Sequence, residues 1–184
     1  MSRKNNINKM NKERVNIYID GSNTFHAQKK LGWIIDWVKV KKYLIKTYDI
    51  VEFKYYTGLK DGDEPTKSFL RYLSKVGVDV VTKPLKKILL DKNDLMFTHS
   101  KDGYVYKANF DVEMTADMLL ETEDINRIII FSGDSDFAYL VKKLKSLGRG
   151  TTVVSSRKTI AWELKLEKAE IIFLEDIESQ IRKT

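Results

Sequence analysis

The chain lacks cysteine altogether and has only two prolines among its 184 residues. Without cysteine, a disulfide scaffold, a thiolate metal site, a thiol nucleophile and a cysteine redox role are all excluded. No apolar run approaches the ~20 residues of a membrane-spanning helix, and the first residues lack the apolar core of a signal peptide. We therefore expect a cytoplasmic protein that does not enter a membrane.

The residues that are present suffice for a packed core. Hydrophobic residues make up 42% of the chain and aromatic residues 11%, a composition that excludes a disordered protein. Domains commonly contain ~100–200 residues, so the length predicts a single domain over residues 15–184. Residues 1–14 are polar, and we expect a flexible basic tail there.

The formal net charge of +7 favours a polyanionic partner. Five Lys and Arg residues and one Glu lie in residues 1–14, so the tail carries +4 of this charge. The rest of the chain is only mildly basic, which makes the distribution of charge more informative than its sum.

Short β-branched segments alternate with amphipathic segments. We expect strands near 15–20, 50–58, 78–84, 125–133, 150–156 and 171–175. We expect helices near 24–31, 35–48, 65–77, 110–121, 136–148 and 159–169, with a final helical turn at 176–182. This alternation predicts an α/β fold with a mainly parallel sheet that is covered on both faces.

One segment breaks this alternation. ILL, LMFTH and YVYKA are short strand candidates around a Lys-Asp-Gly turn at 101–103. They predict a β-hairpin inserted into the main fold at about residues 88–108.

Two of the expected strands end in similar acidic motifs. Tyr-Ile-Asp-Gly-Ser-Asn follows one strand and places Asp20 at its end, whereas Phe-Ser-Gly-Asp-Ser-Asp-Phe follows another and places Asp134 and Asp136 there. Ligands of doubly wound sheets bind outside the carboxyl ends of strands, where the strand order reverses. If these two strands are neighbours at that point, the three aspartates converge. The alternative is that these residues and Asn23 only cap helices.

A third acidic motif, Phe-Asp-Val-Glu-Met-Thr-Ala-Asp, lies at residues 110–117. Asp111 is expected at the N-terminal end of a helix, and Glu113 and Asp117 share one face of it. The alternative is that Asp111 only favours the helix dipole and that Glu113 is solvated.

Together these motifs resemble the NYN domain family, the PIN-like ribonuclease fold of LabA-type proteins. The resemblance covers roughly residues 15–175 and rests on residues 18–23, 107–117 and 132–137. It implies a Rossmann-like three-layer α/β/α sandwich with an acidic metal site and nuclease activity on RNA. It also implies that the carboxylates linked to metal and catalysis are Asp20, Asp111, Asp134 and Asp136, with Asp117 a further metal ligand. The chain departs from the family pattern at Ala108-Asn109-Phe110, where a Gly and a smaller apolar residue are frequent.

A carboxylate site without cysteine suits Mg²⁺ or Mn²⁺ far better than Zn²⁺, because hard cations prefer oxygen ligands. One or two such ions could neutralise the charge that develops when a phosphodiester is hydrolysed. The residues that could orient waters or carboxylates nearby are Asn23, Ser22, Ser132 and Ser135.

Contacts to RNA phosphates are expected from basic residues near the site. The candidates are Lys107, Arg157 and Lys158, together with Lys83, Lys86 and Lys87 before the hairpin. A solvated surface is the alternative for each lysine cluster. Among the tryptophans, Trp37 and Trp162 fit amphipathic patterns and are expected in the core, so Trp33 is the least constrained candidate for base stacking.

The sequence therefore favours a metal-dependent ribonuclease. The alternative is a non-catalytic module on the same fold that binds RNA or recruits proteins. A receiver domain, a haloacid-type phosphatase, a dinucleotide-binding protein and a Walker-loop protein are set aside, because their motifs are missing. Self-association and protein partners stay open.

Overall fold

The computed structural model describes residues 12–89, 103–121 and 123–184. Strands β1 to β3 and β6 to β8 form a six-stranded sheet in the order β3-β2-β1-β6-β7-β8, and every pair in it is parallel. The bounds of these strands are β1 Glu13–Asp20, β2 Tyr48–Leu59, β3 Asp79–Pro84, β6 Arg127–Phe131, β7 Gly150–Ser155 and β8 Glu170–Phe173. The strand order reverses between β1 and β6, at the centre of the sheet.

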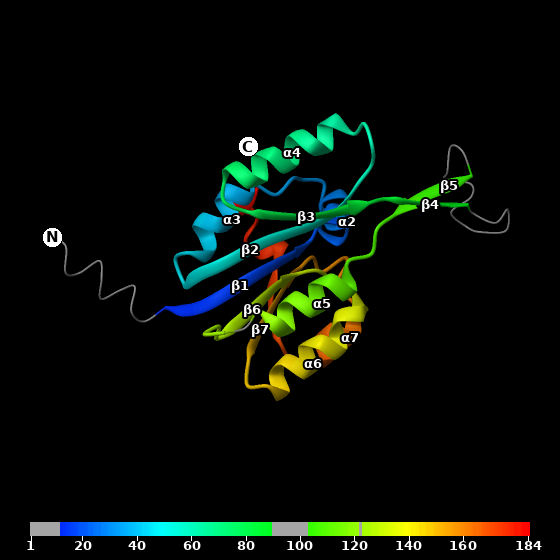
Figure 1. Ribbon diagram of the computed structural model, residues 1–184. Helices are drawn as coiled ribbons and strands as arrows, with labels where there is room; N and C mark the ends of the chain where they lie inside the picture. Colours follow the sequence, from blue (N-terminus) through cyan, green and yellow to red (C-terminus); the bar gives the residue numbers. More distant parts are fainter. Residues whose placement is uncertain (1–11, 90–102, 122) are drawn as a thin grey trace.

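Helices cover both faces of this sheet, and Figure 1 shows α3 and α4 on the side opposite α5, α6 and α7. One layer consists of α2 Gly21–Leu31, α3 Trp37–Leu44, α4 Glu64–Lys75 and α8 Glu178–Ile181. The other consists of α5 Asp111–Leu120, α6 Ala138–Ser146 and α7 Trp162–Leu166. Two 3-10 turns, η2 Ser135–Phe137 and η3 Leu174–Asp176, follow the ends of β6 and β8. The predicted three-layer α/β/α sandwich is therefore confirmed.

The sequence builds these layers by alternation along the central strands. Ile17 and Ile19 of β1 face the core beneath α2, α3 and α4, whereas Tyr18 faces the core beneath α5 and α6. Ile129 and Ile130 of β6 divide between the two cores in the same way. Side chains of a strand point alternately to opposite faces, so a strand buried on both faces reads as an unbroken apolar run.

A bulge interrupts this alternation in β2. Val15 lies opposite Ile50, but Asn16 lies opposite Glu52, so Val51 is an additional residue in β2. Ile50 packs at the α3 face of the sheet, and Phe53 is buried at the same face although three positions separate them. A bulge of this kind changes which residues of a strand face each layer.

The inserted hairpin is also confirmed in its described part. β4 Lys86–Leu89 pairs antiparallel with β5 Tyr104–Lys107 as a separate two-stranded sheet, so the hairpin begins two residues earlier than expected. The strand candidate LMFTH and most of the turn at 101–103 lie outside the described residues. Within the described residues, no helix is both long and apolar enough to cross a membrane.

The expected boundary of the tail at residue 14 is wrong. Glu13 and Arg14 form the start of β1, paired in register with Tyr48 and Asp49 of β2. Both polar side chains are engaged across the edge of the sheet, since Glu13 binds Arg127 at 2.9 Å and Arg14 lies 3.6 Å from Asp124. The prediction that these two residues belong to a flexible tail rested only on their polarity. The earlier residues 1–11 lie outside the described part.

Two of the three tryptophan assignments are also wrong. Trp33, the expected candidate for base stacking, is only 7% exposed, whereas Trp162, expected in the core, is 65% exposed. Trp37 is buried as expected and makes edge-on ring contacts with Phe53, Tyr55 and Phe131 at centroid distances of 5.5–6.4 Å. Trp162 is the first residue of the short helix α7, whose buried residue is Leu164, so its ring is left outside.

The two tryptophans give a matched test of this packing. Replacing Trp37 with Ala removes a buried ring from a close-packed aromatic cluster and should lower the free energy of unfolding by about 3–5 kcal/mol. Replacing Trp162 with Ala should change it by less than about 0.5 kcal/mol. Urea unfolding followed by circular dichroism measures both, and equal losses in the two variants would contradict the packing.

Candidate active site

The two acidic motifs that follow β1 and β6 meet at the carboxyl edge of the central strands. Ile19 and Phe131 are the last paired residues of β1 and β6, so Asp20 and Ser132 follow them side by side. The Ser132 hydroxyl donates to Asp20 Oδ2 at 3.2 Å. The Asn23 side-chain oxygen accepts a hydrogen bond from the Gly133 backbone N–H at 2.7 Å. The structure thus brings together the two strand ends that the sequence predicted to converge.

These motifs also cap the helices that follow them. Asp20 Oδ1 accepts from the Asn23 N–H at 3.0 Å at the start of α2, and Asp134 Oδ1 accepts from the Asp136 N–H at 3.1 Å at the start of η2. Asn23, in contrast, binds across to the other motif instead of capping its own helix. Capping and convergence therefore coexist, because a cap uses only part of the acceptor capacity of a carboxylate.

Gly133 allows the close approach on which this loop depends. A Cβ atom there would lie 2.6 Å from Ser155 Oγ and 2.7 Å from the backbone oxygen of Thr159. The N–H of Ala161 also donates to the Gly133 oxygen at 2.8 Å. The segment before α7 therefore packs directly against the acidic loop, with Trp162 next in the chain.

Asp111 joins the site from the acidic motif at residues 110–117. It is the first residue of α5, and its N–H donates to the Asn109 side-chain oxygen at 2.7 Å. Burial raises the pKa of Asp111, and the charges of Asp134 and Asp136 raise it further. Burial also raises the pKa of Asp20, to which the charges of Asp111 and Asp134 add. Four carboxylates therefore share one electrostatic environment, although they come from distant parts of the chain.

These four carboxylates do not form a complete metal-binding site by themselves. Over residues 12–89, 103–121 and 123–184, no three acidic or histidine side chains gather closely enough to hold a metal ion. The donor chemistry suits a hard cation, since every acidic side chain here offers only oxygen. The carboxylates are thus close enough to repel one another but are not arranged around a common centre.

The cation next to this site is Lys83 of β3. Its amine lies 2.6 Å from Glu113 Oε1 and 4.5 Å from the ring centre of Phe110. Its charge opposes the repulsion that raises the pKa of Asp111. Glu113 is therefore paired with Lys83, which differs from the solvated glutamate considered as an alternative.

The other proposed phosphate contacts lie in different surroundings. Arg157 follows β7, but its guanidinium makes two hydrogen bonds to Asp176, at 2.9 and 2.6 Å, and covers the Phe173 ring. The amine of Lys158 donates to the backbone oxygen of Lys30 in α2 at 3.1 Å. Lys107 is exposed at the end of β5, four residues before Asp111. Of these three candidates, Lys107 alone leads along the chain into an acidic motif.

The other two serines expected to support the site have surroundings that differ from those of Ser132. Ser22 is exposed in the first turn of α2, and Ser135 is half-buried at the start of η2. Ser132 is buried and links Asp20 to the N–H of Asp134, which donates to its hydroxyl at 3.2 Å. Of the serines, Ser132 therefore has the clearest positioning role.

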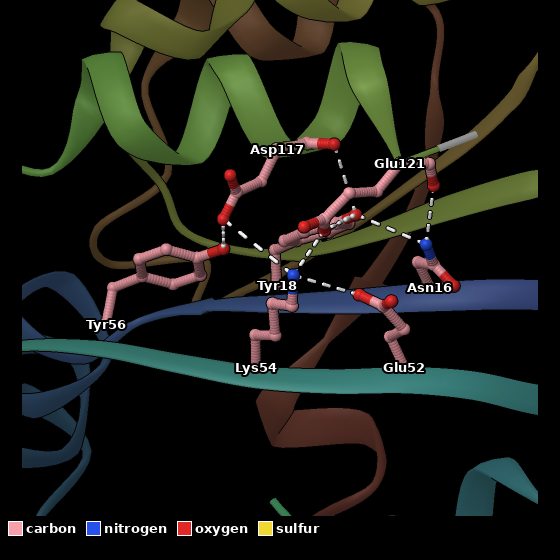
Figure 2. Close-up of polar contacts among 7 residues, drawn as sticks. All are labelled: Asn16, Tyr18, Glu52, Lys54, Tyr56, Asp117 and Glu121. Carbon is pink, nitrogen blue, oxygen red and sulfur yellow. Dashed lines mark hydrogen bonds and ion pairs between the residues drawn. The ribbon is translucent and has the colours of Figure 1, made fainter. Parts of the chain in front are cut away.

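Asp117, the expected further metal ligand, belongs to a different cluster. Its Oδ2 accepts a hydrogen bond from the Tyr56 hydroxyl at 2.6 Å and lies 3.9 Å from the amine of Lys54 (Figure 2). Asp117 is not among the main charges that raise the pKa values of Asp20 and Asp111. Almost two helical turns separate it from Asp111, so it lies further along α5, over the middle of the sheet.

Lys54 is the centre of this second cluster. Its side chain is only 14% exposed, and its amine binds Glu121 and, at 3.0 Å, Glu52. The Tyr18 hydroxyl also donates to the Glu121 carboxylate at 3.2 Å. The side-chain amide of Asn16 donates to the backbone oxygen of Glu121 at 2.8 Å. These contacts fasten the C-terminal half of α5 to β1 and β2, and Figure 2 shows them meeting between helix and sheet.

The sequence analysis missed this cluster. Glu52, Lys54 and Tyr56 alternate along β2, so their side chains point to the same face of a strand expected to be buried. Buried charged residues require partners. That pattern was the available signal, but it could not name α5 as the source of the partners.

The repulsion among the site carboxylates predicts how Asp134→Asn affects stability in EDTA. The raised pKa values of Asp20 and Asp111 mean that their contribution to stability is present below the unfolded pKa and is lost as the pH rises through the folded pKa. Removing the charge of Asp134 reduces its repulsion of Asp20 and Asp111 and so restores part of the stability that is lost at neutral pH. The asparagine oxygen can still accept a hydrogen bond from the Asp136 N–H. The melting temperature at pH 7 should stay the same or rise by up to about 3 °C.

Calorimetry at pH 7 and near pH 4 measures this effect, and any gain should shrink at the lower pH. Asp176→Asn is the control, because that carboxylate is paired with Arg157 and its loss should not raise the melting temperature. A clear fall in the melting temperature of Asp134→Asn would show that the lost charge was stabilising.

Lys54→Met tests the second cluster. Burial alone would lower the pKa of Lys54, but its contacts with Glu121 and Glu52 raise it overall. The stabilisation from these contacts is therefore present at neutral pH and is lost only as the pH rises through the raised pKa. The variant should lose about 2–3 kcal/mol of unfolding free energy at pH 7, because it leaves partly buried carboxylates without a cation. Lys142→Met on the exposed side of α6 should lie within about 0.5 kcal/mol of the parent in the same urea titration.

Comparisons with known proteins agree with this architecture. A model of the NYN domain matches residues 14–175. The chain is 37% identical over 173 residues to the low amplitude and bright protein LabA of Synechococcus elongatus, covering 93% of this chain and 89% of that protein. A crystal structure of a protein of unknown function from Vibrio parahaemolyticus has the same fold, with a TM-score of 0.72, 22% identity and coverage of 94% and 97% of the two chains. The chain belongs to the NYN domain family.

Proposed function

We propose that this protein is a ribonuclease that hydrolyses RNA phosphodiester bonds at the carboxyl edge of β1 and β6. The observation that carries the proposal is the convergence of Asp20, Asp111, Asp134 and Asp136 at the point where the strand order reverses. Sites of doubly wound sheets lie at such points. NYN domains generally have a PIN-like nuclease fold, which favours RNA as the substrate.

The chain supplies a rigid frame for this chemistry. Ser132 and Asn23 tie the loop after β6 to the end of β1, so Asp20 and Asp134 keep their spacing. Asp111 enters on α5, which the Lys54 cluster fixes on the sheet. Groups held in place before substrate arrives lose little freedom when they act, and positioning of this kind contributes substantially to catalysis.

We propose Mg²⁺ or Mn²⁺ as the cofactor, as one ion or two, held by these carboxylates together with oxygens of the RNA. Mg²⁺ commonly binds through one or two carboxylates plus waters and substrate phosphates, so a complete protein cage is unnecessary. The absence of a three-acid group within the described residues therefore fits a cation that binds jointly with substrate. When bound, the ion would neutralise charge on the phosphate and activate a water molecule.

Asp134→Asn should lower Mn²⁺-dependent cleavage of a single-stranded RNA by about 10²–10³-fold, because it removes one of the charges that define the site. Gel analysis of a 5′-labelled RNA measures this. The control is Asp79→Asn, an exposed carboxylate at the start of β3 and at the opposite edge of the sheet, which should cleave like the parent. Unchanged cleavage in Asp134→Asn would overturn the proposed site.

The lack of a three-acid group in the described part of the chain is equally compatible with the second candidate, a non-catalytic RNA-binding module. RNA binding by the unmodified protein in EDTA and in Mn²⁺, measured beside cleavage, separates the two. Binding without cleavage under Mg²⁺ or Mn²⁺ would favour the module, and cleavage that EDTA abolishes would favour the nuclease.

A further inference from the structure

The β4–β5 hairpin forms a two-stranded ribbon that is not part of the main sheet. In Figure 1 it extends away from the sandwich, beyond the end of β3. All four residues of β4 are exposed, including the apolar side chains of Ile88 and Leu89, at 43% and 69%. In β5, Tyr106 and Lys107 are exposed, whereas Tyr104 and Val105 are half-buried. The exposed side chains of the described ribbon are therefore available to a partner.

Strand pairing sorts these side chains onto two faces. Lys87 lies opposite Tyr106 and Leu89 opposite Tyr104, so these four side chains share one face. The Lys87 amine lies 3.8 Å from the ring centre of Tyr104, and the amine of Lys60, from the loop after β2, lies 4.3 Å from that of Tyr106. Aromatic rings and ammonium groups therefore alternate along this face.

The opposite face adds more positive charge. Lys86 lies opposite Lys107 at the base of the ribbon, with Ile88 and Val105 beyond them. The described ribbon segments, residues 84–89 and 103–107, contain three lysines and no carboxylate. Within the described part of the chain, none of these three amines forms an ion pair, whereas Lys54, Lys83, Arg127 and Arg157 all do.

The base of the ribbon is fixed relative to the acidic site. The Leu85 N–H donates to the Leu59 oxygen at 3.1 Å, and a Cβ atom on Gly58 would collide with the side chains of Leu85 and Ala108. Beyond Ala108, the Phe110 ring packs edge-on against Tyr56, with a centroid distance of 5.9 Å. Asp111 follows directly, so it lies four positions after Lys107, at most about 14 Å along the chain.

We infer that this ribbon is a binding arm for single-stranded RNA, which carries the strand toward Asp111. The lysines would contact phosphates, and the rings of Tyr104 and Tyr106 would stack with unpaired bases. Stacking platforms combined with basic grooves are how proteins bind single strands without reading sequence. A duplex offers the same phosphates but no free base faces, so the aromatic face favours a single strand. The inference deepens the proposed ribonuclease function and rests on it.

The test uses the full chain carrying Asp134→Asn, so that the RNA stays intact, and an unstructured U-rich RNA of about 20 nucleotides. Fluorescence anisotropy measures affinity across a range of salt concentrations. Tyr104→Ala with Tyr106→Ala should weaken binding by at least about tenfold, and Tyr104→Phe with Tyr106→Phe should restore most of it, because phenylalanine keeps the ring.

Lys86→Ala with Lys107→Ala should reduce the slope of log affinity against log salt by about 1.4, the value expected for two lost phosphate contacts on a single strand. The matched control is Lys142→Ala with Lys145→Ala on the exposed side of α6, which removes the same charge. The control variant should change the affinity by less than about twofold. If both pairs of substitutions weakened binding equally, the ribbon lysines would contribute only as general surface charge, and the inference would be overturned.

The remaining outcomes are also decisive. If the ribbon variants bind the RNA as tightly as their parent, or the parent does not bind it, the ribbon is not an RNA arm. If the tyrosine variants weaken binding of a duplex of equal length just as strongly, the preference for single strands is wrong. If the ribbon variants weaken RNA binding but the unmodified protein cleaves no RNA with Mg²⁺ or Mn²⁺, the arm stands and the proposed nuclease activity fails. Melting temperatures of all variants confirm that each remains folded.

Discussion

The parallel pairing of β1 with β6 is the contact on which the rest of the structure depends. The chain builds the sheet outward from β1 through β2 and β3, and then returns to place β6 on the other side of β1. Two acidic strand ends therefore become neighbours, with more than a hundred residues of chain between Asp20 and Ser132. Without this pairing, each motif would be no more than a helix cap. With it, the carboxylates that cap these helices form a cluster of negative charges that repel one another.

The opposing demands on these charges explain the surrounding structure. Burial and neighbouring carboxylates raise the pKa values of Asp20 and Asp111, so the protein keeps them together at a cost in stability. The compensating contacts lie beside the site, where Ser132 and Asn23 bind the loop and Lys83 brings a positive charge. A fold that maintains repulsive groups in this way is typical of functional sites.

Much of this arrangement could be predicted from the sequence, because it depends on local patterns. The buried strands, the two acidic strand ends and the antiparallel hairpin each follow from residue alternation and turn chemistry. The convergence of Asp20 with Asp134 needed one further assumption, the adjacency of two strands, which a general rule for doubly wound sheets supplies.

What could not be predicted from the sequence depended on the neighbours of a residue in space. Asp117 shares a motif with Asp111, but its position further along α5 places it over Tyr56 and Lys54, and the motif gives no sign of these contacts. The expected burial of Trp33 and Trp162 is the reverse of what the structure shows, because amphipathic spacing does not tell how much of a short helix is covered by other elements. The strand start at Glu13 was missed because its polar side chains are satisfied by residues more than a hundred positions away, such as Arg127.

The additional residue in β2 bears on where this strand could change in length. Ile50 and Phe53 face the same layer because Val51 lies between them without a partner in β1. Losing Val51 would give a regular strand in which every later side chain keeps its present face. Losing a residue between Phe53 and Tyr56 would instead turn charged groups into the aromatic core. The loss of the additional residue would thus leave both faces of β2 as they are, whereas a loss a few positions later would not.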